Sequence, residues 1–285
     1  MEISRANKIK ISRANKSSIS KIAIYTACIV MSFLVLLPLY LVLLNSFKTV
    51  PESAVVGLSM PEKFMFENYP YVIKEGKLVR AFLNSVLITG STVFITVIFG
   101  SLAAFIIARR NDKITKFVSN YFILGLIAPI ALIPEVAIIK ALGLSGSYLS
   151  VILIHVSVKL PLSIMLYTGF MRGIPQSLDE AAMLDGCSPI KMFFKIIFPL
   201  LKPATFTNII IIFMGVWNDF QISLYFITDG AKNTLPMGIY NFVGYMTYKW
   251  NYVCAFIILT ILPILIIYLF AQKYIIDGMI AGSVK

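Results

Sequence analysis

The sequence is poor in the residues that carry most surface charge and much enzyme chemistry. Only 13% of its 285 residues are charged, whereas soluble proteins average about a quarter. It has a single histidine, His155, and its three cysteines, Cys28, Cys187 and Cys254, lack the spacing of a metal site or a disulfide framework. These scarcities argue against a soluble domain, a metal site and a histidine-based catalytic triad.

Apolar residues are what the chain has in excess. Hydrophobic residues make up 59% of the sequence, and they are concentrated in long runs. Six runs reach the roughly 20 residues that a helix needs to cross a bilayer. Because a helix satisfies its own backbone hydrogen bonds in lipid, we predict an all-α polytopic membrane protein with six transmembrane helices. The runs are Ile22–Phe47, Ala81–Ala108, Phe117–Ile139, Leu149–Met171, Ala204–Thr228 and Tyr252–Gln272.

The basic residues predict the topology. Residues 1–21 hold several lysines and arginines against one acid, Glu2, and we interpret them as a basic cytoplasmic tail before a membrane domain over residues 22–285. With the N-terminus inside, most of the 25 basic residues fall in cytoplasmic segments, which favours both termini inside. Residues 48–80 then form the first external loop. The net charge of +12 is attributed to topology and anionic lipid rather than to nucleic acid.

The segment between the fourth and fifth runs, residues 173–203, predicts two short cytoplasmic helices. Ser177 followed by Glu180 has the pattern of a capping box that would start the first helix. Gly186 suits the left-handed position just past its end. Ser188–Pro189 supplies an N-cap and a first-turn proline for the second helix. Local chemistry therefore predicts a helix–turn–helix element at this place.

The two predicted helices carry apolar stripes although they lie in a cytoplasmic loop. Water disfavours such a stripe, so we expect it to enter a groove of another protein or to rest on the membrane surface. Small alanines would allow close approach, and Glu180 would meet a basic partner at the rim. The stripe consists of Ala181, Ala182, Leu184, Ile190, Phe193, Phe194 and Ile197.

The same segment resembles the EAA loop of ABC importer permeases. That pattern is E-A-A, three residues, G, nine residues, then I-x-L-P. Here Glu180–Ala182 is followed by Gly186 after three residues, by Ile196 after nine more, and then by Pro199. The one departure is Phe198 in place of the leucine. The complete spacing, in a loop between two apolar runs, is a specific signal.

Further short motifs narrow the resemblance, which covers nearly the whole chain from Ile22. Together they are similar to the shorter six-helix partner of the maltose-type carbohydrate permeases. These motifs are Ser46-Phe47-Lys48, Asn84-Ser85, Leu160-Pro161, Trp217-Asn218-Asp219-Phe220 and the terminal Ala281–Lys285.

The resemblance implies one permease subunit of an ATP-driven sugar importer in the inner (cytoplasmic) membrane of a bacterium. The implied partners are a second permease subunit, two cytoplasmic ATPase subunits, an extracytoplasmic sugar-binding protein and membrane lipid. The chain has no G-x-x-x-x-G-K-S/T phosphate loop, so we expect no cofactor on it and assign ATP and Mg to the partner ATPase. The ATPase-coupling residues implied by the resemblance are Glu180, Ala181, Ala182, Asp185, Gly186, Ile196 and Pro199.

Two charged residues, Lys159 and Asp219, fall inside the fourth and fifth runs. An aspartate inside a span costs about 2.5–3.5 kcal/mol on insertion scales and usually faces a cavity or a partner. Counted along continuous helices with a rise of about 1.5 Å per residue, both lie at similar depth. We therefore expect them to pair or to share a polar cavity, either locking two helices or lining the pathway. Trp217 and Asn218 are candidate sugar contacts, and His155 is expected to be a buried polar group.

Three alternatives stay open from the residues alone. An ion-coupled secondary carrier would use the intramembrane charges, but it would not explain the loop spacing. A membrane-embedded enzyme would need a cluster of histidine, cysteine or carboxylate side chains, and the sequence has none. Within the permease family, a phosphate ester such as glycerol phosphate is an alternative to a sugar. We expect no covalent catalysis by this chain.

Overall fold

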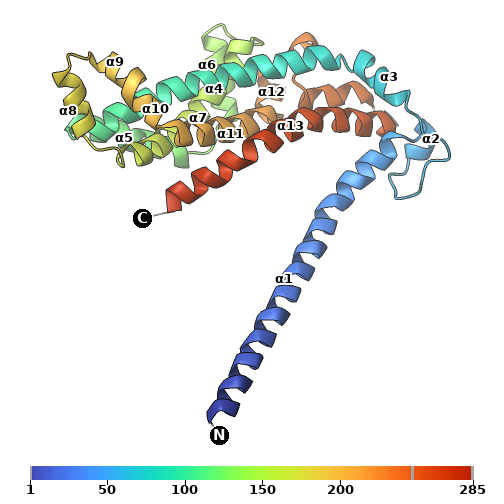
Figure 1. Cartoon of the computed structure of the whole chain (residues 1–285). Helices are drawn as coiled ribbons and strands as arrows, with labels where there is room; N and C mark the ends of the chain where they lie inside the picture. The colour runs from blue at the N-terminus through green and yellow to red at the C-terminus, as the bar shows by residue number, and fades with distance from the viewer. Residues whose placement is uncertain (1, 245–246, 284–285) are drawn as a thin grey trace. The chain divides into compact units, whose positions relative to one another are not determined.

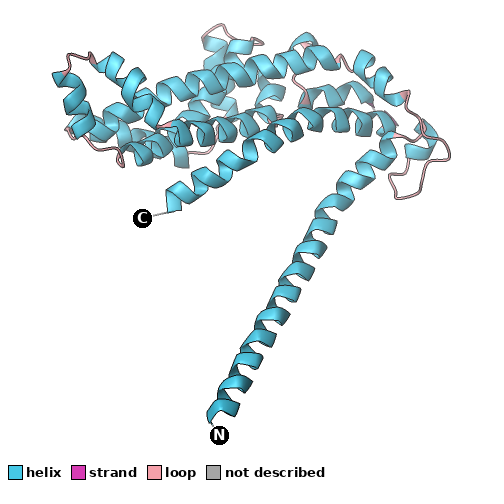
Figure 2. Cartoon of the chain, viewed as in Figure 1, coloured by secondary structure: helices cyan, strands magenta, loops and turns pink. Residues whose placement is uncertain are grey.

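The computed structural model describes residues 2–244 and 247–283, and most of them are helical (Figures 1 and 2). The strands within these residues are β1 (Val243–Gly244) and β2 (Thr247–Tyr248), which pair antiparallel. The chain divides into two compact units, each with its own contacts. They comprise Met1–Pro70 with Phe242–Ile258, and Tyr71–Asn241 with Leu259–Lys285.

Four of the six apolar runs form single helices that are long and apolar enough to cross a membrane. The first of these helices begins at Glu2, so the basic tail is helical and continuous with the first apolar run. The described residues therefore contain four spanning helices, or up to six if each of two bent pairs is one span. These pairs are Lys113–Ile127 with Leu132–Ala141, and Pro189–Leu200 with Lys202–Trp217. The four are α1 (Glu2–Ser46), α4 (Leu78–Arg109), α7 (Tyr148–Met171) and α13 (Trp250–Ser283).

The third run is not the single helix that we predicted. It forms α5 (Lys113–Ile127) and α6 (Leu132–Ala141), which meet at 120°. The break coincides with Pro129, and the preceding residue, Ala128, has the extended backbone (φ −65°, ψ 128°) that a following proline favours. Proline also lacks the amide that would continue the ladder of helical hydrogen bonds.

The fifth run also departs from the prediction of one helix over Ala204–Thr228. Helix α11 (Lys202–Trp217) lies at 80° to the preceding helical segment, Pro189–Leu200, and it ends at Trp217. A short helix, α12 (Gln221–Phe226), follows after a break. The carboxylate of Asp219 accepts hydrogen bonds from the amides of Ile222 and Ser223, so it starts a new helix instead of continuing the old one.

In the first unit, polar side chains fasten the end of α1 to the loop after it. The Asn68 amide donates to the carbonyl oxygens of Ser46 and Lys48 at 2.8 and 2.9 Å. Asn251 Nδ2 donates in turn to Asn68 Oδ1 at 3.3 Å. The Lys48 ammonium is buried and donates to Gly57 O at 3.0 Å. This part of the expected external loop also contains α2 (Val50–Ser53), and α3 (Asn68–Glu75) follows it.

In the second unit, α4 packs closely along α7. A Cβ atom at Gly100 would lie 2.4 Å from Ser163 Oγ, so only glycine permits this approach. Asn208 of α11 donates to the same hydroxyl, and Ser163 donates to the carbonyl of Thr96 at 3.4 Å. Small residues and interhelical hydrogen bonds are what hold helices together in lipid, where burial of apolar surface contributes little.

The expected coupling segment forms a compact element of the second unit. It lies at the same end of this unit as the C-terminus of α4 (Figure 1). The segment contains α8 (Ser177–Leu184), α9 (Pro189–Met192), a π-helical turn (Phe193–Ile197) and α10 (Phe198–Leu200).

Further along the chain, two short 3₁₀ helices lie between α12 and β1: η2 (Gly230–Lys232) and η3 (Pro236–Phe242).

Candidate functional site

The start of α8 differs from the predicted capping box. Gln176 is the N-cap residue, has helical backbone angles (φ −67°, ψ −21°) and makes no side-chain cap. Its carbonyl accepts from the amides of Asp179 and Glu180 at 2.9 and 3.1 Å. The chain thus enters α8 through a tight turn, and Ser177 lies one position too late to cap it. The predicted Ser177–Glu180 box is wrong.

The turn after α8 has the predicted form. Gly186 adopts the left-handed conformation with φ +74°. The Gly186 amide donates to Met183 O and the Cys187 amide to Ala182 O, both at 3.0 Å, which satisfies the last carbonyls of the helix. Asp185 is the C-cap residue and is exposed. A side chain at position 186 would strain the backbone, so the sharp turn depends on glycine.

The second short helix also starts as predicted. Ser188 caps α9 by accepting from the amide of Lys191 at 3.4 Å, and Pro189 occupies the first turn. A π-helical turn follows, in which the amide of Phe198 bonds to the carbonyl of Phe193. Since Pro199 has no amide to donate, this wider turn carries the helix past it to Leu200.

One face of the loop is covered by the chain itself. Ala182, Phe193 and Ile197 are at most 3% exposed, and they share a core with residues of α4, α7 and α11. We predicted that the whole apolar stripe contacts another protein or the membrane surface, and this prediction is wrong for these three residues. The loop folds back on the ends of the long helices, which gives three of the seven stripe residues a partner within the chain.

The opposite face remains open, and we call it the outer face of the loop. On it, Leu184 is 89% exposed, Ile190 71% and Met183 57%. The exposed residues Glu180 and Ala181 lie on α8 among these apolar side chains. Of the other expected coupling residues, Ile196 is half-buried and Pro199 is exposed. The outer face, Glu180–Ala181, Met183–Leu184 and Ile190, is therefore an apolar surface with one acid.

Of the two expectations for Lys159 and Asp219, the direct pair is wrong, and the shared polar cavity stays a prediction. Both residues are described, and no ion pair joins them within 4.0 Å. Asp219 Oδ2 instead lies 3.6 Å from Nε2 of His155, which is buried as predicted. Lys159 Nζ packs near Gly215, where a Cβ atom would lie 2.7 Å from it. The prediction failed because it counted residues along a continuous helix, whereas the chain breaks after Trp217.

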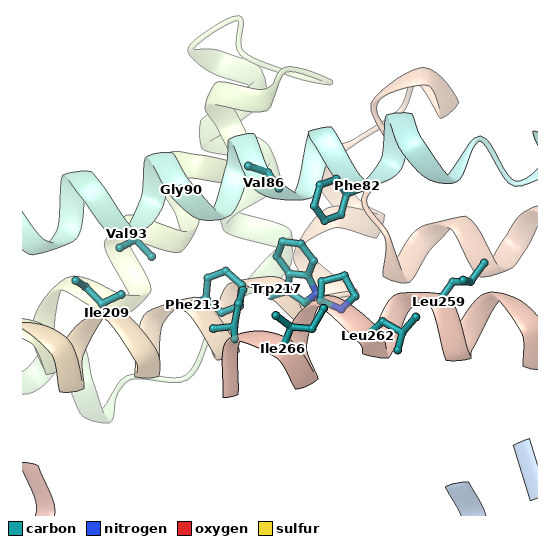
Figure 3. Close-up of a pocket in the computed structure, with 12 residues that line it drawn as sticks. Phe82, Val86, Gly90, Val93, Ile209, Phe213, Trp217, Leu259, Leu262 and Ile266 are labelled. Atoms are coloured by element: carbon teal, nitrogen blue, oxygen red, sulfur yellow. The ribbon is translucent and has the colours of Figure 1, made fainter. Parts of the chain in front are cut away.

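The other two candidate pathway residues face different surroundings. Trp217 is buried, stacks on Phe213 with ring centroids 5.1 Å apart, and meets Phe82 edge-on. It points into a cavity of about 650 Å³ between α4, α11 and α13 (Figure 3). The indole nitrogen is the one polar side-chain atom among the lining residues, so the cavity offers little to sugar hydroxyls. Asn218 is exposed and donates to Met214 O at 2.9 Å.

Comparison with known proteins now decides the family. Residues 96–280 match the family described as "Binding-protein-dependent transport system inner membrane component". The chain belongs to this family. As such an inner membrane component it is an integral membrane protein and part of a transport system, not an enzyme. Membership also sets aside the ion-coupled secondary carrier and the membrane-embedded enzyme.

Several curated relatives of this inner membrane component are sugar permeases by name. It is 35% identical over 262 residues, which cover 90% of this chain and 94% of the relative, to the "Probable starch degradation products transport system permease protein" of Thermoanaerobacterium thermosulfurigenes. It is 34% identical over 252 residues, 87% of this chain and 91% of the relative, to the "Melibiose/raffinose/stachyose import permease protein" of Bacillus subtilis (strain 168).

A solved structure supports the fold of this inner membrane component. One chain of a bacterial ABC transporter "involved in the import of the acidic polysaccharide alginate" superposes with a TM-score of 0.78. The alignment covers 90% of the present chain and 96% of that chain, with 19% identical residues. The helical arrangement is thus similar to that of this transporter chain.

The structure also reveals a residue that the sequence analysis overlooked. Arg109, the last residue of α4, pairs with Asp179 in the first turn of α8. These residues are far apart in the sequence, so no local pattern links them. The available signal was chemical: an arginine that ends an apolar run is placed to bind an acid on the same side of the membrane.

Proposed function

We propose that this chain is the permease subunit of an ATP-driven ABC importer for sugars. It would form half of the translocation pathway and couple to a cytoplasmic ATPase through residues 173–203. The single observation that carries the proposal is the outer face of the loop, where apolar side chains stay exposed on a well-packed element. The names of the relatives, permeases for starch degradation products and for melibiose, raffinose and stachyose, support a sugar as the substrate class.

The outer face suits a groove on a folded partner. Leu184 and Ile190 are exposed on the two helices that the Gly186 turn joins. Burial of such side chains in a partner contributes about 1.5–3 kcal/mol each, which favours docking over exposure to water. Glu180 adds a charge that can meet a basic residue at the rim. ATP and Mg would be bound by that partner, because this chain has no phosphate loop.

We further propose a topology with six spans, in which α5 with α6 forms the third span and α11 with α12 forms the fifth. The basic residues 1–21 and the C-terminus would lie in the cytoplasm together with the coupling loop, as the positive-inside rule favours. Residues 48–80 would then lie outside, where an extracytoplasmic sugar-binding protein delivers its ligand. A second permease subunit and a second ATPase would complete the complex in the cytoplasmic membrane of a bacterium.

The decisive experiment isolates the tagged chain in mild detergent from its native membrane and identifies the proteins that accompany it. We expect an ATPase and a second permease. Leu184→Asn and Ile190→Asn should lose the ATPase but keep the second permease. The matched control is Ile114→Asn, which changes an equally exposed isoleucine (76%) at the start of α5, outside the loop. A stable chain that recovers no ATPase would refute the proposal.

A further inference from the structure

The side chain of Arg109 ties three helical segments together at one end of the second unit. Its Nε donates to Asp179 Oδ2, and its Nη2 donates to Asp179 Oδ1 at 3.2 Å. Its Nη1 donates to the carbonyl oxygens of Met171 and Ile174 at 3.3 and 3.1 Å. The two charged side chains are only 12% and 10% exposed. The segments joined are the end of α4, the end of α7 and the first turn of α8.

The chemistry of this contact is specific to arginine. A planar guanidinium binds a carboxylate through two parallel hydrogen bonds and still has donors left for other acceptors. The carbonyl of Met171, at the end of α7, also accepts from the amide of Ile174 at 3.0 Å, and Arg109 donates to the carbonyl of Ile174 in turn. Arg109 therefore donates to two backbone carbonyls and to a buried carboxylate at once. An ammonium group has three donors on one nitrogen atom and could not make all of these contacts together.

The position of Asp179 makes this contact relevant to coupling. It immediately precedes Glu180, so the buried and the exposed acid of α8 are consecutive residues on two sides of the helix. Both connections of α8 to its neighbours run through glycine: a turn through Gly173 joins it to α7, and the Gly186 turn joins it to α9. The Arg109–Asp179 pair is the contact that fastens the first turn of α8 to a long helix by charge.

We propose that Arg109 is a positioning residue that transmits movement of the coupling loop to α4 and α7. With the clamp in place, a force on the outer face displaces the ends of these helices together with α8. Without the clamp, α8 moves relative to the long helices by bending at its glycine turns, and the movement does not reach α4 and α7. The inference rests on the proposed function, because it assumes that an ATPase acts on the outer face.

The test uses the complete complex in proteoliposomes with its sugar-binding protein. It measures the number of ATP molecules hydrolysed per sugar molecule imported. We expect Arg109→Gln to retain the ATPase and to raise this ratio by about tenfold, within the range known for residues that carry coupling. Arg109→Lys should fall between, since lysine keeps the charge but not the paired geometry. The control is Arg110→Gln, which removes the exposed neighbouring cation and should leave the ratio unchanged.

A second pair of variants keeps the proposal falsifiable if Arg109→Gln does not assemble. Asp179→Asn leaves the arginine with its two backbone carbonyls and should raise the ratio less than Arg109→Gln does. Asp179→Glu keeps a carboxylate, so its ratio should lie closer to the wild-type value than that of Asp179→Asn. A merely structural clamp would lower the yield without changing the ratio. Assembled variants with the wild-type ratio would overturn the inference. A wild-type chain that binds no ATPase would instead refute the proposed function.

Discussion

Two aspartates, Asp179 and Asp219, lie at the starts of short helices and serve opposite purposes. Asp179 in α8 turns its carboxylate away from its own backbone and toward Arg109, a residue of another helix. Asp219 turns its carboxylate onto the amides of α12, and its contact with His155 is longer, at 3.6 Å. The first acid therefore connects helices, and the second shapes its own segment. An acid at the start of a short helix can thus bind that helix to a long one, as Asp179 does, or only stabilise its own first turn, as Asp219 does.

The largest effect should come from separating the connecting pair. Arg109→Leu leaves the Asp179 carboxylate nearly buried without a cation, and loss of one partner of a buried pair costs about 3–5 kcal/mol. The low end applies, since about a tenth of each side chain remains exposed. The double variant Arg109→Leu/Asp179→Leu should regain most of this loss. Thermal unfolding of the purified chain in detergent measures both, and a double variant no more stable than the single one would contradict the pairing.

A smaller loss is expected at the turn that presents the outer face. Gly186→Ala places a Cβ atom on a residue with φ +74°, which costs about 1–2 kcal/mol. The nearby space is open, so this loss would come from the backbone alone. The control is Gly169→Ala within α7, where nothing lies near the added Cβ and alanine favours the helix. If Gly186→Ala unfolds at the wild-type temperature, the turn is not under this constraint.

The acid that acts within its own segment should tolerate change best. Asn caps helices about as well as Asp, so Asp219→Asn is expected to cost less than about 1 kcal/mol. Asp219→Ala removes the cap and should cost about 1 kcal/mol. Unfolding of these variants beside Asp179→Asn sharpens the comparison. If Asp219→Asn lowers the free energy of unfolding as much as Asp179→Asn does, the contact with His155 also connects two helices.

These two regions also mark how far sequence reasoning reaches. Gly186 and Ser188 were predicted because a turn or a cap depends on a few neighbouring residues. Ser177 was misjudged because the chain leaving α7 decides where α8 begins. The pairing of Lys159 with Asp219 failed because periodicity alone does not reveal a break in an apolar run. Arg109 was overlooked because its partner lies in a distant segment, and only the folded chain brings the two together.

The smallest expected effect concerns a third aspartate, Asp112, which caps α5 in the exposed turn after α4. Hydrogen bonds from the amide and then the hydroxyl of Thr115 hold the pKa of this carboxyl below its ordinary value. The stabilisation is therefore complete above the ordinary pKa and is lost as the pH falls through the lowered one. Hydrogen exchange of the Thr115 amide, compared at neutral and strongly acidic pH, should reveal this loss of protection.

The matched variant for that measurement is Asp112→Asn, which keeps a capping oxygen but cannot titrate. Its Thr115 amide should be protected to a similar degree at neutral pH, and the change with acid should disappear. Since the carboxyl is exposed, water and salt screen it, and the difference should stay confined to the first turn of α5. If the amide lost protection equally in the variant, acid would be loosening α5 by another route, and Asp112 would not belong beside Asp219 as an acid that acts within its own segment.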